Sequence, residues 1–99
     1  ELDILVEGHT DTVPIHTDCI EDNWDLSTKR ATSIVRLMQT KFKVLPERMT
    51  AGGRSEYIPK TTNKTVEGRA MNRRTEIIIL PKLDQFFDLL TPPEVKYID

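Results

Sequence analysis

The hydrophobic pattern of this chain changes period along its length, and that change limits the folds open to it. Residues 2–7 and 73–80 are short, apolar and β-prone, and a turn-forming residue follows each run. Between them, apolar residues recur at steps of three and four, which is the period of one buried helix face. They are Leu26, Ala31, Ile34 or Val35, Met38 and Phe42. We expect Ser27 or Asp25 to cap this helix and residues 44–46 to end it.

Two weaker segments complete the order of elements. Residues 48–52 predict a strand, and residues 65–72 predict a short helix that Gly68 weakens. Strand, helix, strand, short helix, strand is the order of an α+β fold, here a β-α-β-α-β sandwich with helices on one face of a mixed sheet. Because three strands make a narrow sheet, we expect further elements before residue 1.

Length and composition set the remaining bounds. A chain of 99 residues forms one domain at most. We assign residues 1–80 to that domain and residues 81–99 to a tail with a short amphipathic helix. A net charge of −2 gives no electrostatic reason to expect nucleic acid as a partner. No apolar run approaches the ~20 residues of a membrane span, so any membrane attachment is expected in segments outside this chain. The single cysteine, Cys19, cannot form an internal disulfide.

The loop before the predicted helix holds the residues that an enzyme or a metal site could use. His9 and His16 could act as general bases beside its carboxylates, as in an envelope hydrolase. Those carboxylates are Asp11, Asp18, Glu21, Asp22 and Asp25. We favour the other interpretation, in which they are solvated loop acids and helix caps. The residues of metal-ligand type do not have the spacing of a zinc or calcium loop; they are His9, Asp11, His16, Asp18 and Cys19. We therefore predict no catalysis, no metal and no cofactor.

Two cations stand in the first turn of the helix as the sequence predicts it. Lys29 and Arg30 would there oppose the helix dipole, so a negative group is expected nearby. Asp11, at the end of the first strand, is one candidate, and the carboxylate of a ligand is another. Arg30 could equally pair with a loop acid or extend into solvent, and the residues alone leave these alternatives open.

Four stretches of the sequence are recognisable together. They read VEGHTD at 6–11, NWDLSTKRA at 23–31, GGRSEYIP at 52–59 and NKTVEGRAMNRRTEI at 63–77. In this order they resemble the signature segments of the OmpA-like (OmpA/MotB C-terminal) family, from residue 2 to about residue 80. The resemblance implies the OmpA-like fold. It also implies a periplasmic, non-catalytic domain that anchors an envelope protein to the cell wall.

The resemblance also implies a ligand, the peptide stem of uncrosslinked peptidoglycan. In this family a diaminopimelate residue is held, with its α-ammonium at the aspartate that matches Asp11. Its α-carboxylate meets the arginine that matches Arg30, and a guanidinium can hold a carboxylate bidentately. Further positions similar to the family's pocket are Thr10, Asn23, Leu26, Arg73 and Arg74. Of the last two, we expect one to face the pocket and the other the surface.

Two departures from the family pattern bear on what the whole protein is. The family normally has a strand and a helix before the position of residue 1. We therefore expect a truncated domain, with reduced stability or a homodimer formed at the exposed edge. The loop at 12–22, including Val13-Pro14-Ile15, is similar to that of flagellar stator members, which are MotB-like. The resemblance thus predicts a periplasmic domain that is attached to the outer membrane or, if the protein is MotB-like, to the inner membrane.

Overall fold

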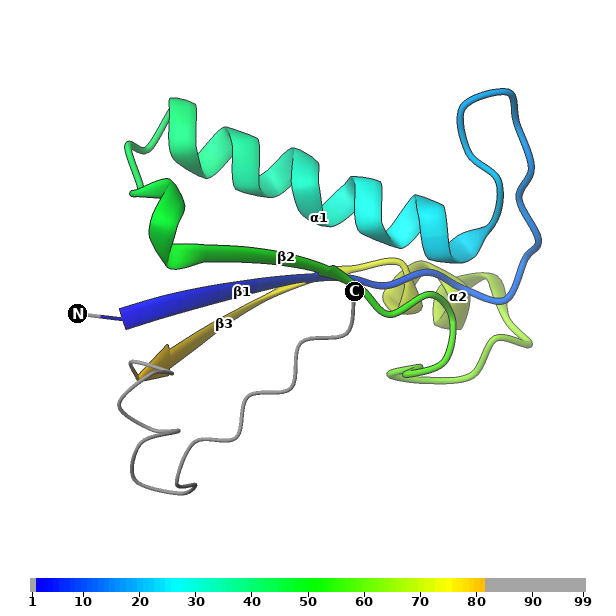
Figure 1. Ribbon diagram of the computed structural model, residues 1–99. Coiled ribbons are helices and arrows are strands. Elements are labelled where there is room, and N and C mark those ends of the chain that lie inside the picture. Colours follow the sequence, from blue (N-terminus) through cyan, green and yellow to red (C-terminus); the bar gives the residue numbers. More distant parts are fainter. Residues whose placement is uncertain (1, 82–99) are drawn as a thin grey trace, which may run out of the picture.

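The computed structural model describes residues 2–81, which form a three-stranded sheet with one long and one short helix (Figure 1). The elements are β1 (Leu2–Gly8), α1 (Asn23–Thr40), the 3-10 turn η1 (Pro46–Arg48), β2 (Met49–Gly53), α2 (Val66–Asn72) and β3 (Thr75–Pro81). The middle strand, β1, runs parallel to β2 and antiparallel to β3. The predicted α+β order and mixed sheet are confirmed. The expected tail helix lies outside the described residues.

The long helix covers one face of the sheet. In Figure 1, α1 runs along β1 and β2, whereas α2 lies beyond the end of the strands. Val6 of β1 and Ala31 of α1 are both 0% exposed, and they form the centre of this contact. Gly8, two residues after Val6, faces the same way because side chains alternate along a strand. An added Cβ at Gly8 would lie 2.0 Å from the carbonyl oxygen of Ser27, so the helix backbone rests directly on the strand.

The start of α1 differs from the prediction. The helix begins at Asn23 rather than near Leu26, and its N-cap is Asp22, whose carboxylate accepts the Asp25 amide at 2.9 Å. The apolar period did not reveal this first turn, because a side-chain cap rather than a buried face fixes where the helix starts. Arg30 therefore lies in the second turn. The expectation that it opposes the helix dipole in the first turn was wrong.

The end of α1 also differs from the prediction. The helix stops at Thr40, and Phe42, which we expected on the buried face, is 64% exposed. Lys43 adopts a left-handed conformation with φ of 58°, and the Val44 amide donates to the Met38 carbonyl at 3.0 Å. This hydrogen bond closes the helix end and turns the chain toward β2. Phe42 thus lies past the last turn that packs on the sheet.

The face of β3 next to α1 carries uncovered apolar side chains. Ile77 and Ile79 are the cross-strand partners of Val6 and Ile4, so all four share the face on which α1 packs. Because α1 lies over β1 and β2, Ile77 is 53% exposed and Ile79 is 61% exposed. Self-association of this chain stays a prediction, which sedimentation velocity would test. Neither helix among residues 2–81 has the length and apolar character to cross a membrane.

The contact at Gly8 leads to a stability prediction. Gly8→Ala places a methyl group against the Ser27 backbone, which cannot move without lifting α1 from the sheet. We expect the free energy of unfolding to fall by at least about 2 kcal/mol. The control is Gly52→Ala, because a Cβ there meets only a Leu5 side-chain carbon, at 3.9 Å. Urea titrations of both variants measure the difference. Equal stability of the two would show that the close approach is not a constraint.

Candidate functional site

The end of β1 is held between the two other strands. Past Gly8, the His9 amide donates to the Arg74 carbonyl at 2.8 Å, just before β3. The Thr10 amide donates to the Ser55 carbonyl at 2.9 Å, just after β2. These two bonds extend the sheet by its backbone and deliver Asp11 to the centre of its end. The end of β1 thus becomes a fixed platform for a functional side chain.

Asp11 forms a close ion pair with Arg73. Its Oδ2 lies 2.6 Å from Nη1 of Arg73, and its Oδ1 accepts the Val13 amide at 3.0 Å. Asp11 is only 6% exposed, whereas the Arg73 side chain is 41% exposed. A charged hydrogen bond of this length is strong, and the second bond fixes the orientation of the carboxylate. The structure thus brings together two of the site residues predicted from the sequence, Asp11 and Arg73.

Arg30 lies near this pair and makes a different contact. Its Nη1 donates to the carbonyl oxygen of His9 at 3.2 Å. Within residues 2–81, no carboxylate forms an ion pair with Arg30, although the side chain is half-buried. It lines a hollow between α1 and the start of β3, whose other lining residues are Leu26, Lys29, Ser33, Ile34 and Thr75. A guanidinium has five N–H donors, so Arg30 can still bind an anion.

Asn23 and Thr10 hold the backbone around Asp11. The Asn23 amide group donates to the carbonyls of Asp11 and Val13, each at 3.2 Å. The Thr10 hydroxyl donates to the same Asp11 carbonyl at 2.9 Å. Asn23 is 7% exposed and Thr10 is 3% exposed, so these side chains fix the backbone at Asp11 from the interior of the protein. Leu26, the remaining predicted pocket residue, lies in the hollow of Arg30 instead.

Arg74 points to a different set of partners from Arg73. Its Nε and Nη2 both lie 2.8 Å from Oε2 of Glu76, and Nη2 also donates to the Ile58 carbonyl at 3.0 Å. The Arg74 side chain is 16% exposed. The expectation that the second arginine faces the surface was wrong. The physical reason is that Glu76 of β3 and the Ile58 carbonyl of the loop after β2 supply it with acceptors.

A buried histidine lies beside this second set of charges. His9 is 1% exposed, and its Nε2 lies 3.4 Å from Glu7 and 3.3 Å from Glu76. Neither ring nitrogen makes a well-oriented hydrogen bond within the described part of the chain. Glu7 is in turn held by Nε of Arg54 at 2.9 Å. A ring so enclosed cannot reach a substrate, so the geometry does not support His9 as a general base.

The acidic loop offers little for catalysis or metal binding. Asp22 caps α1, and one oxygen of Asp25 accepts the Glu21 amide at 3.1 Å. Nδ1 of the exposed His16 lies 3.1 Å from the Glu21 carbonyl. Among residues 2–81, no group of three His, Cys, Asp or Glu side chains is placed to hold a metal ion.

Ser55 is a site residue that the sequence reasoning missed. It is 2% exposed and has a left-handed φ of 54°. Its amide donates to the Ser27 hydroxyl at 3.0 Å, and its carbonyl receives the Thr10 amide. A strained residue without glycine's freedom persists only where its surroundings hold it. The GGRSE stretch was noticed only as part of a family motif, and nothing local to it predicts this linking role.

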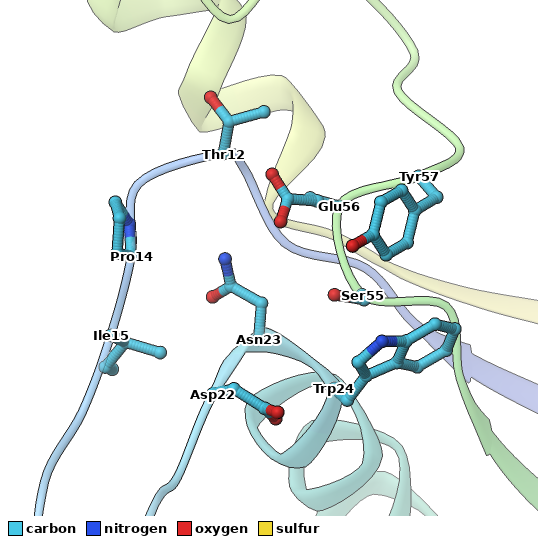
Figure 2. Close-up of a pocket in the computed structure, with 9 residues that line it drawn as sticks. All are labelled: Thr12, Pro14, Ile15, Asp22, Asn23, Trp24, Ser55, Glu56 and Tyr57. Atoms are coloured by element: carbon cyan, nitrogen blue, oxygen red, sulfur yellow. The ribbon is translucent and has the colours of Figure 1, made fainter.

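A second hollow lies at the start of α1, beside Asp11. It has a volume of about 210 Å³ and is shown in Figure 2. Trp24 and Tyr57 stand side by side along one border, and Thr12, Pro14 and Ile15 lie opposite them. The remaining lining residues are Asp22, Asn23, Ser55 and Glu56. The sequence reasoning did not identify this pocket, because the loop at 54–59 reaches α1 only in the folded chain.

Asn72 organises the segment that leads to Arg73. It is 0% exposed and its Oδ1 accepts the amides of Lys60 at 2.8 Å and Thr61 at 3.0 Å. Its Nδ2 donates to the Thr61 carbonyl at 3.0 Å and to Oδ1 of Asn63 at 2.9 Å. One side chain thereby ties the loop at 60–63 to the end of α2. This network fixes the backbone from which Arg73 reaches Asp11.

Comparison with known proteins identifies the family. A sequence model of the OmpA family matches residues 1–73, which is most of the chain. This chain belongs to the OmpA family. Motility protein B of Bacillus subtilis (strain 168) is 42% identical over 79 residues, covering 80% of this chain and 30% of that protein. The chain therefore spans less than a third of the length of that relative.

Solved structures agree with the OmpA assignment. The cell wall anchor of the T6SS from Pseudomonas aeruginosa is 42% identical with a TM-score of 0.71, covering 79% of this chain and 53% of that one. The C-terminal domain of Helicobacter pylori MotB has a TM-score of 0.76 at 22% identity, covering 91% of this chain and 70% of that one. The second likeness shows the fold alone. Together they confirm the predicted OmpA-like fold.

The Asn72 network leads to a prediction for this OmpA domain. Asn72→Ala leaves the partly buried amides of Lys60 and Thr61 without their acceptor, which should cost about 1–3 kcal/mol of stability. Asn63→Ala removes only the bond between the two side chains, so its cost should be smaller. Thermal unfolding of both variants measures this. Similar melting temperatures for Asn72→Ala and the unmodified chain would contradict the assigned role.

Proposed function

We propose that this OmpA domain binds the peptide stem of peptidoglycan without catalysis and so anchors an envelope protein to the cell wall. The proposal rests on the burial and the partners of two charged side chains at the end of the sheet. Asp11 is buried and fixed, while the half-buried Arg30 has no carboxylate partner within residues 2–81. A ligand that carries a carboxylate near an ammonium complements both.

The free end of a diaminopimelate stem is such a ligand. Its α-carboxylate would meet Arg30, whose planar fork suits a bidentate contact. Its α-ammonium would meet Asp11, in exchange for Arg73. The 41% exposure of the Arg73 side chain is compatible with this exchange, because solvent can receive its charge. Crosslinking turns the ammonium into a neutral amide, so the proposed ligand is the uncrosslinked stem.

Relatives support the anchoring part of the proposal. The Pseudomonas structure that is 42% identical to this chain is itself the cell wall anchor of the T6SS. We place this domain in the periplasm, and the protein that it anchors in the outer membrane through segments outside this chain. The absence of turnover is part of the proposal, supported by the enclosure of His9. Release of soluble fragments from purified sacculi incubated with the domain would refute it.

A flagellar stator anchor is the second candidate. Its support is the 42% identity to Motility protein B of Bacillus subtilis. In that case the same binding to the peptide stem would anchor an inner-membrane protein. The test is a chimaera in which this domain replaces the matching segment of that relative. Restored motility would favour the stator, whereas a stable but immotile chimaera would favour the outer-membrane anchor.

The two proposed contacts can be separated by mutation. Asp11→Ala and Arg30→Ala should each weaken pull-down by sacculi at least tenfold, because removing one charge of a buried pair costs ~2–5 kcal/mol. Arg30→Lys should also bind weakly, since the forked geometry is lost. The matched controls are Asp18→Ala and Arg36→Ala, which alter an exposed loop acid and an exposed arginine of the same helix.

Circular dichroism must first show that each variant is folded. Undiminished pull-down by both folded alanine variants at Asp11 and Arg30 would overturn the proposed site. A loss in the Arg36→Ala control equal to that in Arg30→Ala would reduce the interaction to general charge attraction. Salt dependence separates a specific site from general charge attraction, because salt screens an enclosed ion pair less than an exposed one.

Selectivity among stems follows from the same charges. A lysine stem keeps the ammonium but lacks the carboxylate, so Arg30 would be desolvated without a partner. We expect lysine-type muropeptides to bind more than tenfold more weakly than diaminopimelate-type ones. Crosslinked stems should also lose affinity, because Asp11 is left unpaired. Calorimetric titration with the three ligands tests this. Equal affinity for the lysine and diaminopimelate forms would mean that Arg30 does not contact the carboxylate.

A further inference from the structure

The turn that follows α1 presents an aromatic side chain between two exposed cations. Phe42 is 64% exposed, and both of its neighbours, Lys41 and Lys43, are exposed as well. Leu45, in the same turn, is 51% exposed. We call residues 41–45 the helix-end turn. Single apolar residues are common on protein surfaces, whereas a group of them interleaved with positive charge is a candidate interaction surface.

The backbone of the helix-end turn holds Phe42 outward. The Val44 amide donates to the Met38 carbonyl at 3.0 Å, and Lys43 keeps its left-handed φ of 58°. Nζ of Lys41 lies over the Phe42 ring, 5.8 Å from its centroid. The exposed ring thus belongs to a closed turn and not to a frayed helix end. A surface that is formed before binding loses little conformational entropy when it binds.

The charges of the chain are unevenly distributed around this turn. Residues 36–48 hold four Lys or Arg and one Glu, hence a local charge of +3, whereas the whole chain has a charge of −2. At physiological salt, charges more than about 8 Å apart are largely screened from each other. This end of an acidic domain can therefore be attracted to an anionic surface.

We propose that the helix-end turn is a peripheral contact site for an anionic lipid surface. In this contact Phe42 and Leu45 enter the boundary between headgroups and acyl chains, while Lys41 and Lys43 stay at the level of the lipid phosphates. A lysine suits this boundary, because its stem packs on apolar surface while its ammonium remains in water. Surfaces of this kind bind through buried apolar area together with attraction to anionic lipids.

Other occupants fit the helix-end turn less well. An acidic polymer or peptide would neutralise the lysines but leave Phe42 and Leu45 in water. A second copy would cover these apolar side chains, but a symmetric contact would bring Lys41 and Lys43 close to the same lysines of the other copy. Like charges placed together at an interface oppose binding. An anionic lipid surface complements the apolar side chains and the cations at once.

The helix-end turn lies far from the proposed stem site, and the inference goes beyond that function. Figure 1 shows the link from α1 to η1 at one end of the domain and the loop after β1, which carries Asp11, at the other. The 18 residues of α1 between them correspond to about 27 Å of helix. A domain that touches lipid at the helix-end turn would therefore direct Asp11 away from the membrane.

The lipid contact would be weak by itself. One lysine near an anionic surface contributes about fivefold to affinity, so two lysines and one ring give reversible binding. In a protein that other segments hold at a membrane, the effective concentration of lipid is high, and a weak contact is then occupied much of the time. Its effect would be to orient the domain.

Co-sedimentation of the 99-residue protein with vesicles tests the proposal. The vesicles consist of equal parts of phosphatidylcholine and phosphatidylglycerol, or of phosphatidylcholine alone. We expect binding to the anionic vesicles only, and weaker binding as the salt concentration rises. Lys41→Gln and Lys43→Gln should each weaken binding about fivefold. Phe42→Ser should weaken it by a similar factor or more, because the apolar contribution is lost.

Tryptophan fluorescence reports on insertion directly. The one tryptophan of the chain, Trp24, lies in the first turn of α1, so its emission should not respond to anionic vesicles. The double variant Trp24→Phe, Phe42→Trp moves this reporter to the helix-end turn. Its emission should shift to shorter wavelength on binding, because the ring leaves water.

Matched controls remove the same kinds of group at the other end of the domain. Tyr57, which is 62% exposed beside the start of α1, corresponds to Phe42. The exposed Lys60 and Lys64, between β2 and α2, correspond to the two lysines of the helix-end turn. Tyr57→Ser, Lys60→Gln and Lys64→Gln should leave vesicle binding unchanged. Asp11→Ala should also leave it unchanged, so failure of the proposed stem site is seen separately.

Several outcomes would overturn the lipid contact site. One is no binding to anionic vesicles at low salt, and another is equal binding to anionic and neutral vesicles. Equal losses in the lysine variants at the two ends would reduce the interaction to general charge attraction. Sedimentation velocity without vesicles tests the remaining occupant. A dimer of the unmodified chain that disappears in Phe42→Ser would assign the helix-end turn to a second copy.

Discussion

At Gly8 the backbone of β1 rests on the carbonyl of Ser27, so close that any side chain at this position would overlap the helix. This contact sets the distance between the sheet and α1. A residue larger than glycine would lift the helix, and the loop carrying Asp11 would then separate from Asn23, which fixes its backbone. The site thus depends on a small packing contact several residues away, because hydrogen bonds tolerate changes of only a few tenths of an ångström.

Ser27 carries this constraint to the rest of the site. Its hydroxyl receives the amide of Ser55, whose carbonyl in turn receives the amide of Thr10. Helix, loop and strand are therefore joined through one buried serine pair. The left-handed backbone of Ser55 shows that this joint is held against local preference. The titratable side chains then form two groups at the end of the sheet. Asp11 is bonded to Arg73 in one group, and in the other the buried Glu7 and His9 lie beside the half-exposed Glu76.

Local chemistry made much of the fold predictable. Strand and helix periods depend on which side chains must be buried, so the elements and their order followed from the sequence. The helix ends did not, because they are set by single hydrogen bonds. With Asp22 as its N-cap, α1 begins three residues earlier than the apolar period indicated. It ends at Thr40, and the chain turns away at the left-handed Lys43, so Phe42 does not pack on the sheet. Arg30 therefore lies one turn further into the helix than predicted. The helix-dipole argument no longer applies to it, although it still contacts the His9 carbonyl, two residues before Asp11.

The sequence by itself determined the α+β order, because element order follows from residue type and spacing, and its four motifs identified the family and the candidate charged residues by resemblance. Only the tertiary structure decided which charge meets which. It paired Asp11 with Arg73, directed Arg74 to Glu76 and left Arg30 beside a backbone carbonyl. It also brought together Trp24 and Tyr57, 33 positions apart in the printed sequence, at one pocket. Such pairings depend on how loops cross at the end of the sheet, and no local pattern encodes that crossing.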